Sequence, residues 1–191
     1  MGREFELKFG ATEEKLAALH RRYPHLAPIA METTYYDTPD GLLSSRYWTL
    51  RRRMENGRSV CTLKTPASEF GRNEWEVECG NIQDALIPLC EAGAPLQLLT
   101  LTARGITESC GARFTRLAGM LELEGTTAEL ALDRGVLTGG GRELPFAEVE
   151  VELKSGSEEA AIRFAEALAA EFGLKPEKKS KVARARALAK G

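Results

Sequence analysis

The sequence predicts an α+β fold: an eight-stranded antiparallel β-barrel with helices packed on its outer side. Short segments in which charged and apolar residues alternate recur along the chain, as strands with one polar face require. The turn sequence Glu55-Asn56-Gly57 favours an antiparallel hairpin, because Asn-Gly readily adopts positive φ. A barrel with a wet interior is favoured over a sandwich, because the charged faces are rich in residue types that bind ions or phosphate.

The first strand, residues 3–9, places Glu4, Glu6 and Lys8 on one face and its apolar residues on the other. The same pattern returns near the far end of the chain. There Glu148-Val149-Glu150-Val151-Glu152-Leu153-Lys154 echoes Glu4-Phe5-Glu6-Leu7-Lys8. A single strand of this kind is more often a solvated surface strand, and the repetition argues against that interpretation.

The other elements follow from turn and helix signals. Thr12 can cap a short helix that Pro24 ends, and the turn sequence at 37–41 closes a strand over 31–37. Further strands are expected over 46–54, 59–65, 72–79, 112–118, 120–125, 128–133 and 143–154. A mainly helical connection, interrupted by Pro88 and Pro95, is expected over about 81–104. The chain is then expected to form an amphipathic helix over 157–172 and a short basic helix over 178–190.

Composition narrows the class of protein. The chain has 191 residues, which predicts one domain over residues 1–191. A net charge of −2 gives a nucleic-acid partner no support, and no apolar run is long enough to span a membrane. The first residues enter a charged strand, so we expect no signal peptide, and the four cysteines lack CxxC spacing. We therefore expect reduced cysteines, a cytoplasmic protein and neither a nucleic-acid nor a membrane partner; a homodimer stays open.

The charged faces indicate one kind of ligand if they converge. Carboxylates would come from the two terminal strands, residues 72–78 and Asp133. The basic groups would be Lys8, Arg51, Arg53, Lys64, Arg72, Lys154 and either Arg113 or Arg116. Unpaired charges are unfavourable in a confined space. A ligand that joins a divalent cation to several phosphates would satisfy both sets, because carboxylates suit Mg²⁺ or Mn²⁺ and basic side chains suit phosphate.

These motifs resemble the CYTH domain, a member of the triphosphate tunnel metalloenzymes. The matching segments, in the family's order, are 4–8, 35–39, 50–53, 62–65, 72–76, 131–135, 148–156 and 180–181. The chain is most similar to the bacterial inorganic triphosphatase-like branch, which often carries a C-terminal CHAD domain. The 191 residues correspond either to a standalone form or to the N-terminal part of such a protein.

The resemblance implies a tunnel that binds a linear triphosphate with Mg²⁺ or Mn²⁺ and hydrolyses inorganic triphosphate to pyrophosphate and phosphate. It implies Glu4, Glu6, Asp133, Glu148, Glu150 and Glu152 as metal ligands, with the pair used in the last strand left open. It implies substrate contacts by Lys8, Arg51, Arg53, Lys64, Arg113, Arg116 and Lys181. Arg113 and Arg116 are alternatives, because they point to opposite faces of the same strand. The catalytic residues that it implies are Lys8, Glu74 and Glu76.

Other functions stay open from the sequence. Thiamine triphosphatase and class IV adenylate cyclase activities belong to the same family, and they would differ in what occupies the tunnel mouth. A non-catalytic polyphosphate-binding module is the alternative from another class. The many carboxylates argue against that module, because binding an anion alone does not require them.

Overall fold

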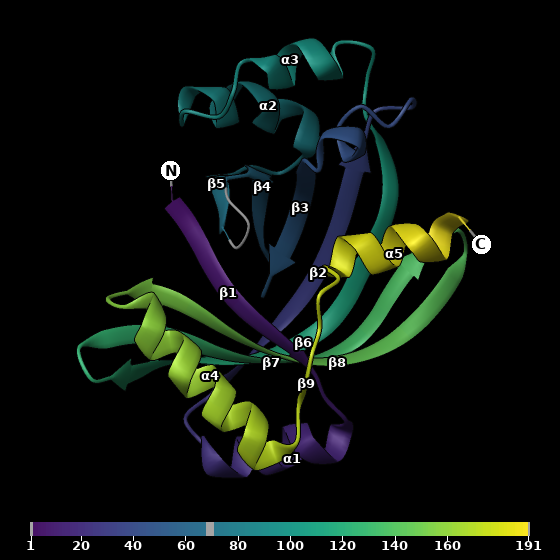
Figure 1. Cartoon of the computed structure of the whole chain (residues 1–191). Coiled ribbons are helices and arrows are strands. Elements are labelled where there is room, and N and C mark those ends of the chain that lie inside the picture. The colour runs from purple at the N-terminus through teal and green to yellow at the C-terminus, as the bar shows by residue number, and fades with distance from the viewer. Residues whose placement is uncertain (1, 68–70, 191) are drawn as a thin grey trace.

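The computed structural model describes residues 2–67 and 71–190, so the predicted domain boundaries at Met1 and Gly191 lie outside it. Eight strands form one antiparallel sheet in the order β5-β4-β3-β2-β6-β7-β8-β1, and pairing of β1 with β5 closes it into a barrel (Figure 1). The predicted fold class is therefore confirmed. The strands are β1 (Gly2–Gly10), β2 (Ala27–Asp37), β3 (Thr49–Glu55), β4 (Arg58–Pro66), β5 (Gly71–Glu78), β6 (Thr107–Leu123), β7 (Thr126–Gly139) and β8 (Arg142–Ser155), with a two-residue β9 (Lys175–Pro176) beside β1.

Tight turns fix the hairpins. Asn56 and Gly57, between β3 and β4, have φ of 49° and 87°, which is the type I′ geometry that matches strand twist. The structure corrects one predicted break. Residues 112–118 and 120–125 were expected as two strands, but β6 runs through Gly119, where a side chain would lie 2.9 Å from Leu26. Gly119 therefore permits close packing inside a strand and does not mark a turn.

Two pairs of helices cover the outer face of the barrel (Figure 1). The helices α1 (Glu13–Arg22) and α4 (Glu158–Phe172) bury apolar residues of β1, β7 and β8, such as Val149 and Val151. The helices α2 (Ile82–Glu91) and α3 (Gln97–Thr102) cover β3 to β5, including Trp75. The outward side chains are thus apolar, and the alternating charged side chains point inward.

The last helix, α5 (Lys181–Lys190), has a different place (Figure 1). It packs on β6, β7 and β8, and its Val182 and Ala185 join a third apolar cluster with Phe114 and Phe146. These partners share strand parity with the inward-facing Arg116 and Glu150, so α5 covers the inner face at one end of the barrel. The short basic helix expected over 178–190 therefore contributes to the interior, and Lys181, expected as a substrate contact, lines the cavity. Within the described parts of the chain, no helix has the length and apolar character needed to cross a bilayer.

Candidate functional site

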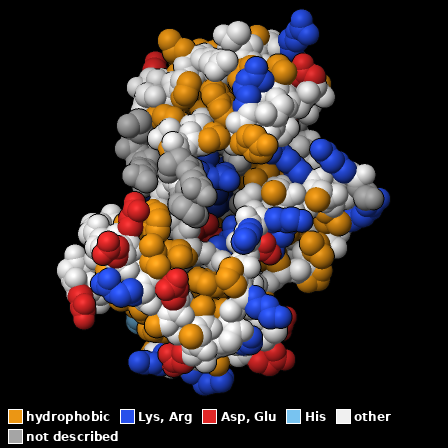
Figure 2. Space-filling model, in the orientation of Figure 1, with side chains coloured by type: hydrophobic (Ala, Val, Ile, Leu, Met, Phe, Trp, Pro, Cys, Tyr) orange, Lys and Arg blue, Asp and Glu red, His pale blue; other side chains and the backbone are white. Residues whose placement is uncertain are grey.

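The barrel encloses a cavity of about 370 Å³ whose lining is dominated by charged side chains. Eight glutamates and nine lysines or arginines contribute to it, from β1, β3 to β8 and the segment that begins α5. Figure 2 shows a hollow near the middle of this face of the molecule, with Lys and Arg side chains inside it. The convergence of charged faces from separate strands, which the sequence pattern indicated, is therefore a feature of the fold.

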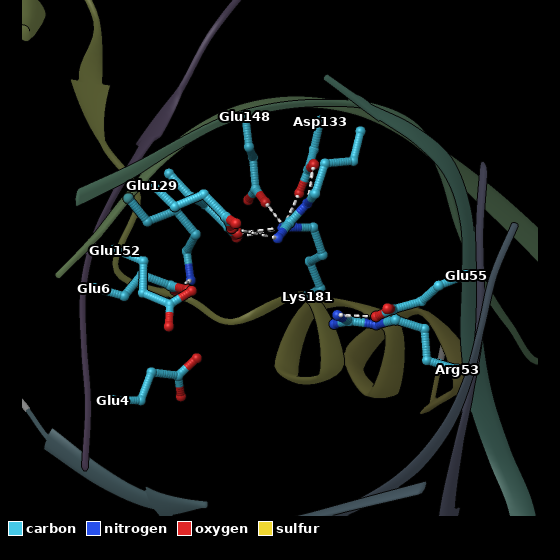
Figure 3. Close-up of polar contacts among 12 residues, drawn as sticks. Glu4, Glu6, Arg53, Glu55, Glu129, Asp133, Glu148, Glu152 and Lys181 are labelled. Carbon is cyan, nitrogen blue, oxygen red and sulfur yellow. Dashed lines mark hydrogen bonds and ion pairs between the residues drawn. The ribbon is translucent and has the colours of Figure 1, made fainter. Parts of the chain in front are cut away.

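One side of the cavity is acidic. In the sheet register Glu6 lies opposite Glu152, and Glu152 lies opposite Glu129 on the next strand. These three side chains and Glu4 point into the cavity from β1, β8 and β7 (Figure 3). Like charges in lateral register repel one another, so this row is unfavourable unless cations lie among them.

The pKa of Glu6 reflects both its burial and this repulsion. Burial and the neighbouring carboxylates Glu150 and Glu4 raise the pKa of Glu6 from 4.5 to about 7. Lys64 and Lys8, whose Nζ lies 4.0 Å from Glu6 Oε1, offset only part of this rise. Burial is also the main cause that raises the pKa of Glu152, although Lys154 lies 2.8 Å away. This side of the cavity therefore favours an added cation.

The opposite side of the cavity is basic. Arg51 and Arg53 enter from β3 and Lys64 from β4, and Arg51 lies 3.5 Å from Glu74. The Nε atoms of both arginines are buried, and neither has a hydrogen-bond partner among the described residues. Burial and the positive charges of Arg51 and Arg116 lower the pKa of Arg53, and the negative charge of Glu55 offsets only part of this effect. This side therefore favours an added anion.

A third group lies where α5 meets the barrel. Asp133, Glu148 and Glu150 each offer one carboxylate oxygen within 4.8 Å of the others, and we call them the carboxylate triad. Lys181 Nζ lies among them, 2.8 Å from Asp133 and 2.6 Å from both Glu148 and Glu150 (Figure 3). Arg116 donates two hydrogen bonds to Asp133, at 2.8 and 2.7 Å, and pairs with Glu150.

Most of the residues singled out from the sequence line the cavity. They are Glu4, Glu6, Lys8, Arg51, Arg53, Lys64, Glu74, Glu76, Arg116, Glu150, Glu152 and Lys181. Asp133 and Glu148 do not line it, because they are fully buried behind Lys181. Glu76 lies at a wetter position, with half of its side chain exposed.

The structure corrects the assignment of Arg113 as a substrate contact. Arg113 lies opposite Val136 on β7 and pairs outside the barrel with Glu143, with 58% of its side chain exposed. Arg116 has the other strand parity, so its side chain enters the interior and meets Asp133. Of these two alternatives, only Arg116 can contact a ligand in the cavity.

Sequence reasoning missed three residues of this region. Glu129 has the parity of Asp133 on the same strand, and that spacing was a usable signal. Arg184 pairs with Glu148 and lies three residues after Lys181 on α5, which places both side chains on one helix face. Glu55 ends the inward face of β3, and its parity with Arg51 and Arg53 could have identified it.

The donor sets fit a divalent cation. The triad and the acidic side supply carboxylate oxygens, which are the ligands that Mg²⁺ and Mn²⁺ prefer. Glu148 Oε2 is buried and, in the described residues, receives no hydrogen bond of good geometry, although the Lys181 ammonium group lies 2.6 Å away. A buried carboxylate oxygen without a directional donor is suited to a metal ion.

Comparison with known proteins gives a consistent picture. The family model described as the CYTH domain matches residues 2–185. An inorganic triphosphatase of Haemophilus influenzae is 30% identical over 146 residues, which cover 71% of this chain and 39% of that protein. The chain thus spans well under half the length of this relative.

Solved structures share the fold. A putative adenylyl cyclase from Hippeastrum, described as having a dominant triphosphatase activity, superposes with a TM-score of 0.68 at 21% identity, covering 98% of this chain and 96% of that one. A protein from Pyrococcus horikoshii superposes with a TM-score of 0.64 at 24% identity, covering 98% and 99%. At these identities the likeness extends to the fold alone.

Proposed function

Because this chain belongs to the CYTH domain family, we propose that its cavity binds inorganic triphosphate with a divalent metal ion and hydrolyses it to pyrophosphate and phosphate. One observation carries the proposal: the acidic side of the cavity favours an added cation, and the basic side favours an added anion. A metal–triphosphate complex supplies both charges in one ligand. The inorganic triphosphatase of Haemophilus influenzae supports this substrate.

The position of each carboxylate relative to the cavity indicates its role. Glu4, Glu6, Glu150 and Glu152 face the cavity and would hold Mg²⁺ or Mn²⁺, with Asp133 and Glu148 behind them. When bound, such an ion neutralises charge on the phosphates and lowers the pKa of a coordinated water.

The basic side chains bind and orient the triphosphate. Arg51, Arg53 and Arg116 carry guanidinium groups that match phosphate oxygens, and Lys8 and Lys64 add ammonium groups nearby. Because these groups are held by the barrel before the ligand binds, they stabilise the charge that develops on the transferred phosphoryl group and on the leaving pyrophosphate when water attacks the terminal phosphorus. Lys8 then serves as a charge stabiliser or proton donor, and Glu74 and Glu76 orient the attacking water.

Phosphate release from tripolyphosphate, with and without Mg²⁺ or Mn²⁺, tests the proposal. We expect Glu4→Gln and Lys8→Met each to lower kcat/KM by about 100-fold, the size of effect seen when one preorganised stabilising group is lost. Arg113→Ala is the matched control, since its side chain lies outside the barrel, and it should retain wild-type turnover. Wild-type turnover by Glu4→Gln and Lys8→Met would exclude this site.

The same assay, run on a substrate panel, tests the rival functions. Thiamine triphosphate and ATP, scored for phosphate and for cyclic AMP, would identify a thiamine triphosphatase or an adenylate cyclase. Tight binding of long polyphosphate without metal and without turnover would identify a non-catalytic binding module. We expect tripolyphosphate to give the highest metal-dependent kcat/KM of this panel.

A further inference from the structure

The carboxylate triad has the spacing of a cation site, and an amino-acid side chain already fills it. Lys181 Nζ contacts an oxygen of Asp133, Glu148 and Glu150 at 2.6–2.8 Å, and 9% of the Lys181 side chain is exposed. Lys181 also lines the cavity that the triphosphate is proposed to occupy. One ammonium group cannot hold the triad and also bind phosphate in this position.

We propose that Lys181 is the resident counter-cation of the carboxylate triad, and that it leaves the triad when a divalent ion binds there and turns toward the triphosphate. The inference rests on the proposed function, because it concerns the same metal and substrate. It adds a role that neither the fold nor the proposed reaction assigns, namely an exchange of one cation for another at a buried site.

Charge balance supports the exchange. The three carboxylates of the triad are matched by three cations, Lys181, Arg116 and Arg184. A divalent ion added to this neutral group would leave two uncompensated positive charges in a buried site, which is strongly unfavourable. Departure of one resident cation removes half of that excess, and the bound triphosphate supplies the remaining negative charge.

Lys181 is the cation best placed to leave. Arg116 is fixed by a two-pronged pairing with Asp133 and by a contact with Glu150. Arg184 lies behind Glu148 and does not line the cavity. Lys181 is the first residue of α5 and reaches the triad through a flexible four-carbon chain, so rotation of that chain can move the ammonium group without moving the helix.

The exchange predicts that loss of Lys181 strengthens metal binding, whereas loss of a residue that supports the metal site would weaken it. If Lys181 competes with the metal, then Lys181→Met should raise the Mn²⁺ affinity of the substrate-free protein at least tenfold, measured by electron paramagnetic resonance of free Mn²⁺. The control is Lys178→Met, which removes an exposed ammonium group that lines the same cavity and contacts no carboxylate of the triad, and it should change the affinity less than threefold.

An equal gain in both variants would show a general charge effect and would overturn the proposal. Unchanged or weaker Mn²⁺ binding by Lys181→Met would overturn it as well. The absence of Mn²⁺ binding in both the wild-type protein and this variant would also overturn it.

A second measurement uses the unaltered chain, in case Lys181→Met does not fold. In the ¹⁵N-lysine NMR spectrum, assigned with Lys181→Arg, the buried Lys181 ammonium signal should shift or exchange into the solvent-averaged signal as Mg²⁺ is added. A Lys181 signal that stays in place at saturating Mg²⁺ would overturn the exchange, even in a protein that hydrolyses tripolyphosphate. Conversely, displacement of Lys181 without any phosphate release would refute the proposed function and leave the exchange intact.

Discussion

At the scale of single residues, the cavity contrasts carboxylates that have strong partners with carboxylates that do not. Glu150 contacts Lys181 and Arg116, and these cations hold its pKa well below the usual range in spite of burial. Burial and the nearby Glu150 and Glu4 raise the pKa of Glu6 to about 7, and Lys64 and Lys8 offset only part of that rise. Burial opposes ionisation of both glutamates, and only Glu150 has close cations that outweigh it, so the two differ in protonation near neutral pH.

This difference predicts how pH acts on the metal-free protein. The pKa of Glu6 is about 7 when folded and about 4.5 when unfolded, so the folded state binds more protons between these values and stability falls as pH rises. Glu6→Gln removes that loss. We expect it to raise the free energy of unfolding by about 1–2 kcal/mol at pH 8.5 and by little at pH 4.5, less than the full shift implies because 27% of the side chain is exposed.

Urea unfolding in EDTA, followed across this pH range, measures the effect. Glu78→Gln is the control, because Glu78 lies on the same strand face as Glu74 but has 63% of its side chain exposed beside Arg58. An equal gain for both variants, or a gain for Glu6→Gln that is independent of pH, would contradict the assignment of Glu6 as an ionisation-destabilised group.

At the scale of elements, the alternation of single strands was readable from the sequence, and the packing between elements was not. The inward faces of β1, β3, β4 and β8 follow directly from period-two patterning. For β6 the pattern offered both Arg113 and Arg116, and only pairing with β7, which sets Arg116 opposite Asp133, decides between them. At Gly119 the sequence suggested a break between two strands. The glycine is instead needed for close packing against Leu26, which is distant in sequence and so could not be inferred from the local pattern.

The sequence resemblance implied that Lys181 reaches the ligand, but it did not show how α5 docks, because the docking depends on close packing against Gly139 at the end of β7. A side chain at Gly139 would lie 2.4 Å from the carbonyl oxygen of Ala185. Glycine is therefore required there for α5 to approach the barrel, although helix composition alone suggests a solvated end.

Gly139→Ala should consequently displace α5. We expect it to lower the free energy of unfolding by about 1–3 kcal/mol, as overpacking of a tight contact does, and to weaken tripolyphosphate binding because Lys181 moves with the helix. Gly80→Ala is the control, since nothing lies within 4 Å of its added methyl group. Urea unfolding and calorimetric titration report the two effects, and wild-type values for Gly139→Ala would contradict tight docking of α5.

At the scale of the whole molecule, closure of the barrel explains the repeated motif. The first strand pairs with β8, so Glu6 lies opposite Glu152 and Lys8 opposite Glu150. The two similar sequences at the ends of the chain are thus neighbouring strands of one wall. The pairing of β1 with β5 then brings Glu4 beside Lys64 and Glu74, where acidic and basic sides of the cavity meet.

A barrel with opposite charges on two sides of its cavity should be stabilised most by a ligand that neutralises both. A ligand that binds only the folded state at 100 times its Kd adds about 2.7 kcal/mol, which for a chain of this size raises Tm by about 5–10 °C. We expect Mg²⁺ with tripolyphosphate to give such a rise in differential scanning fluorimetry, and either component alone to give much less. A full rise with tripolyphosphate in EDTA would instead indicate metal-independent anion binding, because the basic side alone would then account for the affinity.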